Sequence, residues 1–491
     1  MLNIGSRSVK ANYILNVLRI ASIALIGIFT IPHVSRVLGP ENLGKVEYIY
    51  TIINYFVLFS GLGIPMYGIR EISKCRDNFR ERNKVVLELY LILFVTTIIS
   101  YLGIVLIYNL SYFQEYKDLI LIMCSMVFLS NIGAEWYFQG TENQLFITVR
   151  NVILRLIVFG LIIYLINISS DYKVYAFLLV LATFGANVLN FLIIIKDVLK
   201  EKFKRSEIDI RRHFKPILTI FVATISVNIY LQLDNLLIGS ISGDKYVGFY
   251  SIANKLIRFL ISFITIIGAV LLPRVSYLYL NDKEQYNIYI HKSFNILALM
   301  SIPFTVFFFV FADQIIYYMG GEDFNPSILT MQILSPLCFI VSMAYFMGFI
   351  ILYPQNRERL YTVATIVSAV FSICINYFAI SYFQQNGAAT VAVMSELLAI
   401  GIMYYYLRKE ELLKDIIDMN ILKILVAGLA MFIFSFFLRV YFEYNFIIFL
   451  LFVGFSFTIY VSVSLLLREK FIYSFIRGFV LRTKNNNNGR L

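Results

Sequence analysis

Long runs of apolar residues alternate with short polar connections along almost the whole chain. A helix that crosses a hydrocarbon core of roughly 30 Å needs about 20 mainly apolar residues. Runs that hold no charged residue, such as 48–69, 89–114 and 444–467, are long enough to meet this requirement. The pattern predicts an all-α polytopic membrane protein with about 14 spans. They lie near residues 13–36, 46–69, 85–109, 118–138, 150–168, 173–195, 216–239, 247–272, 292–312, 328–352, 360–381, 387–407, 421–442 and 446–467.

Two short motifs recur at similar distances along the chain. Gly39–Gly44 and Gly243–Gly248 are both Gly-x4-Gly turns after a predicted span, 204 residues apart, and Phe146–Thr148 and Leu360–Thr362 form a second pair 214 residues apart. Repetition at a fixed offset indicates one structural unit used twice. We expect two pseudo-symmetric six-helix lobes, an arrangement typical of transporters that rock one lobe against the other. The predicted boundaries are 1–210 with a basic linker from about 196, then 211–410, then 411–491 with two further helices and a basic tail.

The distribution of Lys and Arg predicts the orientation in the membrane. The chain carries a net charge of +12, yet only 15% of its residues are charged and its mean hydropathy is +0.77. If the N-terminus is cytoplasmic, the inner connections hold 32 Lys and Arg and the outer loops hold four, Lys45, Lys117, Lys173 and Lys245. Positive residues concentrate on the cytoplasmic side of membrane proteins. Both termini are therefore predicted to be cytoplasmic, and the positive charge is not a nucleic-acid signature.

The motifs expected of enzymes are incomplete in this sequence. Residues 39–45 match Gly-x4-Gly-Lys, but Val46 stands where a phosphate-binding loop needs Ser or Thr, and the motif follows a hydrophobic helix. The three histidines, His33, His213 and His291, are far apart along the chain. No predicted outer loop exceeds about 16 residues, which leaves no room for an external catalytic domain. We expect neither catalytic residues, nor a metal, nor a cofactor.

Cationic side chains interrupt several of the apolar runs. Arg19, Arg155, Lys255 and Arg258 lie within predicted spans. A charge inside a bilayer costs roughly 2.5–3.5 kcal/mol on insertion scales, so such residues face a bundle interior or a watery cavity. The four residues predict a cationic cavity that binds an anionic substrate. The alternatives are that they snorkel to the interface or form structural ion pairs, for example with Asp234.

Uncharged polar residues extend this pattern on the first and seventh spans. Asn12, Asn16 and Arg19 recur at i, i+4 and i+7, which places them on one helical face. The corresponding residues of the seventh span are predicted to line the same cavity. They are Asn228, Gln232 and Asn235.

Three carboxylates are candidates for coupling transport to an ion gradient. Glu396 interrupts the twelfth span, Asp234 lies near the outer end of the seventh, and Glu135 precedes Trp136 at the inner end of the fourth. Intramembrane carboxylates commonly form proton or sodium sites. Hydrogen bonding to neighbouring side chains is the alternative role.

Several short segments together resemble a known family across nearly the whole chain. They are Arg36–Pro40 with Gly44, Gly61–Pro65, Tyr67–Glu71, Glu135–Gly140, Asp234, Gly239 and Val247–Tyr250. These segments are similar to those of Wzx-type O-antigen/capsule polysaccharide repeat-unit flippases, in the polysaccharide transport family of the MOP exporter superfamily. The resemblance implies a MATE/MurJ-like pair of lobes around a cationic cavity.

The resemblance also implies a function and a set of partners. The substrate would be an undecaprenyl-pyrophosphate-linked oligosaccharide that crosses the bacterial cytoplasmic (inner) membrane, driven by an H⁺ or Na⁺ gradient. Partners would be membrane lipids and, as candidates, a polysaccharide polymerase and glycosyltransferases, with no nucleic acid. One alternative is a multidrug cation antiporter of the same superfamily, which would require a cavity with few fixed cations. The other is a membrane polysaccharide polymerase, which would require large outer loops.

Overall fold

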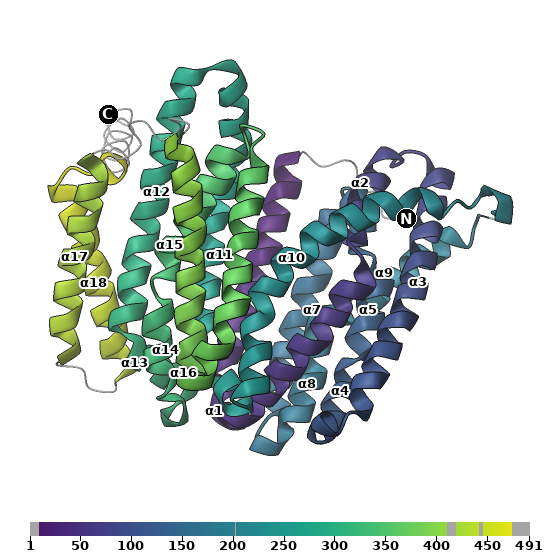
Figure 1. Cartoon of the computed structure of the whole chain (residues 1–491), viewed down its shortest axis with the longest axis horizontal. Coiled ribbons are helices and arrows are strands. Elements are labelled where there is room, and N and C mark those ends of the chain that lie inside the picture. Colours follow the sequence, from purple (N-terminus) through teal and green to yellow (C-terminus); the bar gives the residue numbers. More distant parts are fainter. Residues whose placement is uncertain (1–8, 202, 410–418, 441–444, 474–491) are drawn as a thin grey trace, which may run out of the picture. The chain divides into compact units, whose positions relative to one another are not determined.

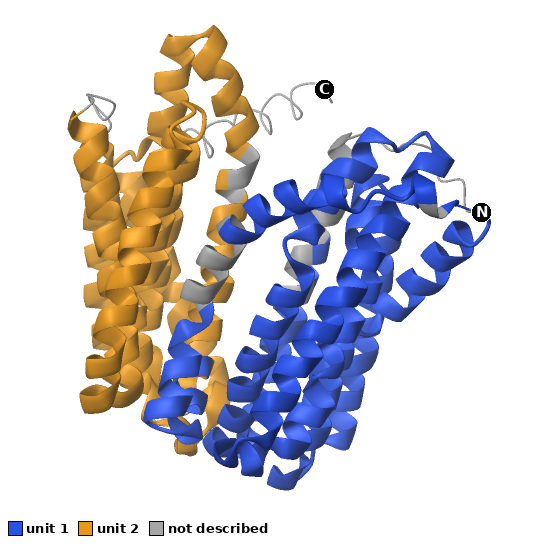
Figure 2. Ribbon diagram, turned by 45° about the vertical axis from the view of Figure 1, so that its right-hand side comes forward, with its two compact units in different colours: residues 1–251 blue, residues 252–491 orange. Residues whose placement is uncertain are grey.

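The fold consists of helices that form two compact units. The computed structural model describes residues 9–201, 203–409, 419–440 and 445–473, and every regular element within these ranges is helical. Unit 1 comprises residues 1–251 and unit 2 residues 252–491 (Figure 2). The division falls inside helix α11 (Asp244–Asn281), so α10 (Arg211–Ile241) belongs to unit 1. The two six-helix lobes and their boundaries at 210 and 410 stay a prediction.

The helices follow the predicted spans closely (Figure 1). In unit 1 they are α1 (Val9–Gly61), α2 (Ile64–Lys74), α3 (Phe79–Asn109), α4 (Lys117–Met123), α5 (Ser125–Gly133), α6 (Glu135–Gly140), α7 (Gln144–Leu165), α8 (Tyr172–Val180), α9 (Asn187–Val198) and α10. From α11 onward they are α12 (Lys283–Val310), α13 (Ala312–Gly320), α14 (Ser327–Leu334), α15 (Leu337–Tyr345), α16 (Glu358–Lys409), α17 (Met419–Val440) and α18 (Phe446–Leu466).

Eleven helical stretches among the described residues are long and apolar enough to cross a membrane. The first stretch, Leu25–Lys74, contains span 46–69 and the second half of span 13–36, with the non-helical Gly39 between them. Helix α16 contains both span 360–381 and span 387–407, with the non-helical Gln384 between them. Helix α10 covers the remaining predicted span, residues 216–239. The all-helical membrane architecture predicted from the sequence is therefore confirmed.

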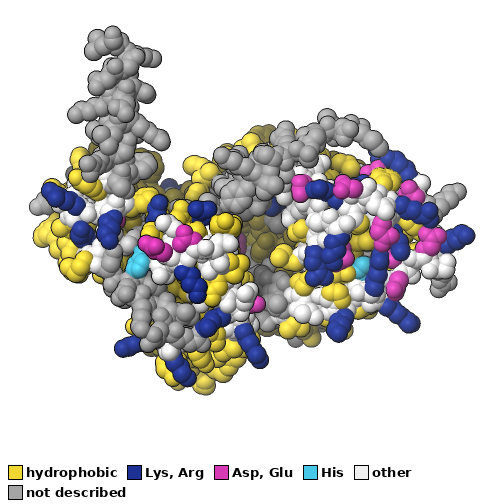
Figure 3. All heavy atoms as spheres, turned by 90° about the horizontal axis from the view of Figure 1, so that it is seen from above, with side chains coloured by type: hydrophobic (Ala, Val, Ile, Leu, Met, Phe, Trp, Pro, Cys, Tyr) yellow, Lys and Arg dark blue, Asp and Glu magenta, His cyan; other side chains and the backbone are white. Residues whose placement is uncertain are grey.

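The outward faces of these helices are apolar. On α3, Phe94, Ile98, Leu102 and Leu106 are exposed at four-residue intervals, whereas Leu89 on the same helix is buried. Large contiguous apolar surfaces of this kind mark a face that contacts lipid. Charged residues gather instead at the ends of the helices, where Lys74 and Arg80 of unit 1 are 62% and 60% exposed (Figure 3).

The two Gly-x4-Gly turns pack against each other within unit 1. A methyl group on Gly44 would overlap the carbonyl oxygen of Asp244, and one on Gly248 would overlap that of Pro40. Gly44 and Gly248 are equivalent under the offset of 204 residues, and so are Pro40 and Asp244. Such a reciprocal contact is what a two-fold relation produces. It supports the internal repeat that the sequence predicts.

Candidate functional site

A break between α5 and α6 places Glu135 at the start of a new helix. Ala134 has a left-handed backbone, with φ of 37°, which ends α5 and leaves carbonyl oxygens without helical partners. Two side chains of other helices donate to these oxygens: Asn190 Nδ2 to Gly133 O at 2.7 Å and Tyr90 Oη to Ile132 O at 2.9 Å. The break is thus fixed by neighbouring helices, and Glu135 is fixed with it.

Glu135 joins three elements of unit 1. Its Oε2 lies 3.3 Å from Nη1 of Arg19 on α1, and its Oε1 accepts hydrogen bonds from Arg150 Nη2 at 2.9 Å and Asn151 Nδ2 at 3.2 Å, both on α7. The side chains of Arg19, Arg150 and Glu135 are 15%, 5% and 30% exposed. The structure therefore brings together two predicted site residues, Arg19 and Glu135, and adds Arg150, which the sequence analysis did not select.

Arg155 adds a third cation to this group. It lies about one turn further along α7 than Arg150, is half-buried, and interacts electrostatically with Glu135 and Arg19. We call Arg19, Glu135, Arg150, Asn151 and Arg155 the Glu135 cluster. Three guanidinium groups and one carboxylate give the cluster a formal charge of +2.

Arg150 keeps donors available within the cluster. Its Nε and Nη1 are buried and have no hydrogen-bond partner among the described residues, while its guanidinium group lies 5.6 Å from the Phe146 ring centroid. A buried donor without a partner costs roughly 1–3 kcal/mol. An anion with several acceptor oxygens would remove this cost.

The polar residues of α10 form hydrogen bonds within unit 1. Asp234 is 7% exposed and accepts a hydrogen bond of 2.6 Å from the hydroxyl of Tyr250 on α11. Gln232 accepts one of 2.9 Å from Asn54 of α1, and Asn235 one of 3.4 Å from Ser251. The side chains of the predicted residues Asn12, Asn16 and Asn228 lie outside the described residues.

The remaining predicted residues belong to unit 2. Lys255 is exposed and Arg258 half-buried on α11, where Arg258 Nε donates to Asn254 Oδ1 at 3.3 Å. Glu396 is half-buried in α16 and interacts electrostatically with Tyr361. Because Arg19 lies in unit 1, the predicted combination of Arg19, Lys255 and Arg258 stays a prediction.

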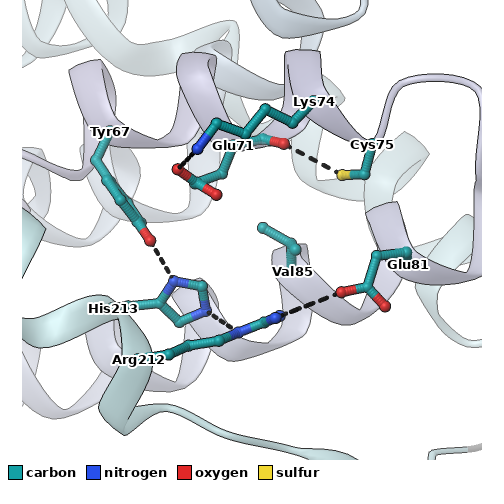
Figure 4. Close-up of a pocket in the computed structure, with 8 residues that line it drawn as sticks. All are labelled: Tyr67, Glu71, Lys74, Cys75, Glu81, Val85, Arg212 and His213. Carbon is teal, nitrogen blue, oxygen red and sulfur yellow. Dashed lines mark hydrogen bonds and ion pairs between the residues drawn. The ribbon is translucent and has the colours of Figure 1, made fainter.

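A second polar group fastens the start of α10 to α2 and α3. Glu88 Oε2 accepts hydrogen bonds from Arg212 Nη2 at 2.6 Å and from His213 Nε2 at 2.9 Å, and Tyr67 Oη lies 2.6 Å from His213 Nδ1. Arg212 also reaches Glu81, and the side chains of Tyr67, Glu81, Arg212 and His213 line a pocket at the end of the bundle (Figure 4). Its charged groups are already paired with one another, so we interpret this group as a structural clasp.

Comparisons with known sequences point to polysaccharide export. The pattern of the family described as "Polysaccharide biosynthesis protein" matches residues 9–279, and that of the family described as "MatE" matches residues 219–378. A protein of Escherichia coli (strain K12) assigned as an O-antigen transporter is 23% identical over 416 residues, which cover 84% of this chain and 100% of the relative. A Shigella flexneri protein with the same assignment is 22% identical over 423 residues, or 81% and 98% of the two chains.

Solved structures with the same fold are transporters. The lipid II flippase MurJ in its inward closed conformation has a TM-score of 0.72 at 14% identity and is matched over 92% of this chain and 98% of its own. An inward-facing multidrug resistance MATE family transporter of the MOP superfamily has a TM-score of 0.58 at 16% identity, over 83% and 96% of the two chains. These similarities confirm the predicted MATE/MurJ-like fold.

Proposed function

Because this chain belongs to the polysaccharide biosynthesis protein family, we propose that it moves undecaprenyl-pyrophosphate-linked oligosaccharide repeat units across the bacterial cytoplasmic membrane. The protein is a multi-pass membrane transporter of the O-antigen type and not an enzyme. Its substrate is a lipid-linked glycan for a surface polysaccharide such as O-antigen or capsule.

The charge of the Glu135 cluster supports undecaprenyl pyrophosphate as the lipid carrier of the substrate. A pyrophosphate that links a lipid to a sugar carries one negative charge on each phosphate group, and the cluster has a formal charge of +2. Guanidinium groups bind phosphate oxygens through charge-assisted, often paired, hydrogen bonds. Arg19, Arg150 and Arg155 are therefore proposed to bind the pyrophosphate, and Lys255 and Arg258 to contribute from unit 2.

The two rival functions fit the residues less well. A multidrug cation antiporter is favoured by the match of residues 219–378 to the MatE pattern, but a cluster of three arginines around one carboxylate would repel a cationic drug. A membrane polymerase needs large outer loops, and the predicted outer connection between α7 and α8 spans only residues 166–171.

Transport is proposed to use an ion gradient, with Glu396 and Asp234 as coupling groups. Asp234 is buried, and its carboxylate accepts a hydrogen bond from Tyr250. A buried carboxylate of this kind can bind a proton or Na⁺. The polymerase and glycosyltransferases of the same polysaccharide are proposed as partners. Both termini are proposed to be cytoplasmic, as the Lys and Arg distribution indicates.

A leaflet assay tests the proposed function. In cells that lack the protein, the lipid-linked repeat unit should accumulate on the cytoplasmic face, and the intact protein should restore surface polysaccharide. Arg19→Ala and Arg155→Ala should lower export at least about tenfold, the factor that corresponds to one charge-assisted hydrogen bond. Arg439→Ala is the matched control because Arg439 pairs with Asp313 at 3.0 Å in unit 2. Normal export by both Arg19→Ala and Arg155→Ala would contradict the assignment.

A further inference from the structure

Glu135 is held unequally by its two arginine partners. The contact to Arg150 measures 2.9 Å and is joined by the hydrogen bond from Asn151, whereas the single contact to Arg19 measures 3.3 Å. Charge-assisted N–H···O bonds have typical lengths of about 2.7–2.9 Å, and longer ones are weaker. The bond to Arg19 is thus the one that breaks at the lower cost.

The local fold supports the same asymmetry. Arg150 and Asn151 follow Glu135 by 15 and 16 residues, and α6 and α7 are joined by a short turn, while Arg19 is 116 residues away on α1. The backbone before Glu135 is pinned by Asn190 and Tyr90 at the α5–α6 break. Glu135 therefore stays with α7 when Arg19 exchanges its partner.

The empty cluster needs a counter-charge. Without the carboxylate, the guanidinium groups of Arg19, Arg150 and Arg155 would repel one another in a largely buried environment. Leaving buried charges uncompensated is strongly destabilising. Glu135 supplies the negative charge that a phosphate supplies when substrate is bound.

We propose that Glu135 is a built-in counter-anion that pairs with Arg19 when no substrate is bound, and that a phosphate headgroup must displace it from Arg19 in order to bind. The proposal rests on the proposed function of the Glu135 cluster. A headgroup binds by taking Arg19 from Glu135, so it must interact with Arg19 more favourably than a carboxylate does. The cost of this displacement is the same for every phosphate headgroup, so Glu135 lowers the affinity of the site for phosphates in general and leaves ligands without a phosphate unaffected.

The fluorescence of Trp136 can be used to follow the displacement of Glu135 from Arg19. Trp136 is the only tryptophan, it follows Glu135 directly, and it is 4% exposed, packed against Gly68 of α2. Titrations of the purified full-length protein in lipid nanodiscs can follow Trp136 fluorescence with farnesyl pyrophosphate, farnesyl phosphate and farnesol as probes. The wild-type protein should bind both phosphates at least about tenfold more tightly than farnesol.

Glu135→Gln keeps the shape of the side chain and removes its charge. It should raise the affinities for farnesyl pyrophosphate and farnesyl phosphate about tenfold each and leave the affinity for farnesol unchanged. Glu142→Gln is the matched control, since Glu142 is 46% exposed and pairs with Arg76 at 2.7 Å away from the cluster. Arg19→Gln serves as the second variant, because it leaves the Glu135–Arg150 pair intact. It should weaken the binding of both phosphates, because it removes the guanidinium group for which Glu135 and the headgroup compete.

The outcomes separate this inference from the proposed function. If wild-type protein binds farnesyl pyrophosphate no better than farnesol, the cluster is not a pyrophosphate site and the proposed function fails. If the wild type binds the phosphates better than farnesol and Glu135→Gln binds them no more tightly than the wild type, only the counter-anion role is refuted. Equal weakening of both phosphates in Glu135→Gln would likewise refute it, because Glu135 would then act as a support for the arginines and not as a competitor.

Discussion

At the scale of single residues, Glu88 shows how much depends on one buried carboxylate. Its side chain is 0% exposed and accepts hydrogen bonds from Arg212, from His213 and from the backbone N–H of Asp209. Glu88→Ala would leave the buried His213 and the Asp209 N–H without this acceptor. We expect a loss of stability on the order of 3 kcal/mol, measured as a lower midpoint of thermal unfolding in detergent.

Glu81 offers a matched comparison for that measurement. It lies seven residues before Glu88 on α3, is 40% exposed, and contacts the same Arg212 at 3.4 Å. Exposed ion pairs contribute about 0–1 kcal/mol, so Glu81→Ala should hardly change the midpoint. Equal effects of the two substitutions would show that the clasp is not a buried unit.

At the residue scale, the sequence singles out charged residues inside apolar runs but not a buried arginine within a polar connection. Arg19 and Glu135 stood out because charges are rare inside apolar runs, and the structure places them in contact. Arg150 was counted as one of the basic residues of an inner connection, since nothing in its sequence surroundings marks it as buried. Its burial follows from the α6–α7 turn, and that turn follows from the left-handed Ala134. Alanine is a strong helix former, so no sequence signal predicts a helix break there.

At the scale of elements, the turns that begin at Gly39 and Gly243 pack so closely that neither has room for a side chain at its second glycine. Gly44→Ala or Gly248→Ala would push a methyl group into the backbone of the opposite turn. Inserting extra atoms into a close-packed contact typically costs about 1–3 kcal/mol. Both variants should therefore unfold at lower temperature and export less polysaccharide.

Gly160→Ala on α7 is the control for this pair, because nothing lies within 4 Å of the position its methyl group would take. Replacing Gly by Ala inside a helix is favourable by about 1 kcal/mol in propensity, so this variant should be at least as stable as the wild type. The turns were found in the sequence from their shared offset. Their mutual contact could not be predicted, because two similar segments need not be neighbours in space.

A second element-scale prediction concerns the α5–α6 break. Asn190→Ala removes the donor to the Gly133 carbonyl, at 2.7 Å in the structure, and leaves that buried oxygen unpaired. The expected loss of stability is about 1–3 kcal/mol. Asn190→Gln, which can still donate to the carbonyl, should recover part of both the unfolding midpoint and the transport rate. Unchanged stability in Asn190→Ala would mean that the break does not depend on this hydrogen bond.

At the scale of the whole molecule, the orientation in the membrane follows from charge alone and can be measured. The connection after α9 carries exposed Lys200 and is predicted to be cytoplasmic, whereas the connection after α7 carries exposed Asn167 and is predicted to be external. Both positions tolerate a cysteine, because Lys200 forms only a surface pair with Asp197 and Asn167 is exposed. The four native cysteines, Cys75, Cys124, Cys338 and Cys374, are free thiols and can be replaced beforehand.

Labelling with a membrane-impermeant thiol reagent then decides the orientation. Asn167→Cys should react in intact cells in which the reagent reaches the outer face of the cytoplasmic membrane, and Lys200→Cys should react only after the membrane is permeabilised. The expectation rests on the excess of Lys and Arg in the inner connections, which sets topology through short loops. The reverse pattern would place the Glu135 end of unit 1 at the outer face. In that case the cluster would meet its substrate on the release side, and Glu135 would serve to expel the headgroup from Arg19 instead of competing with it at entry.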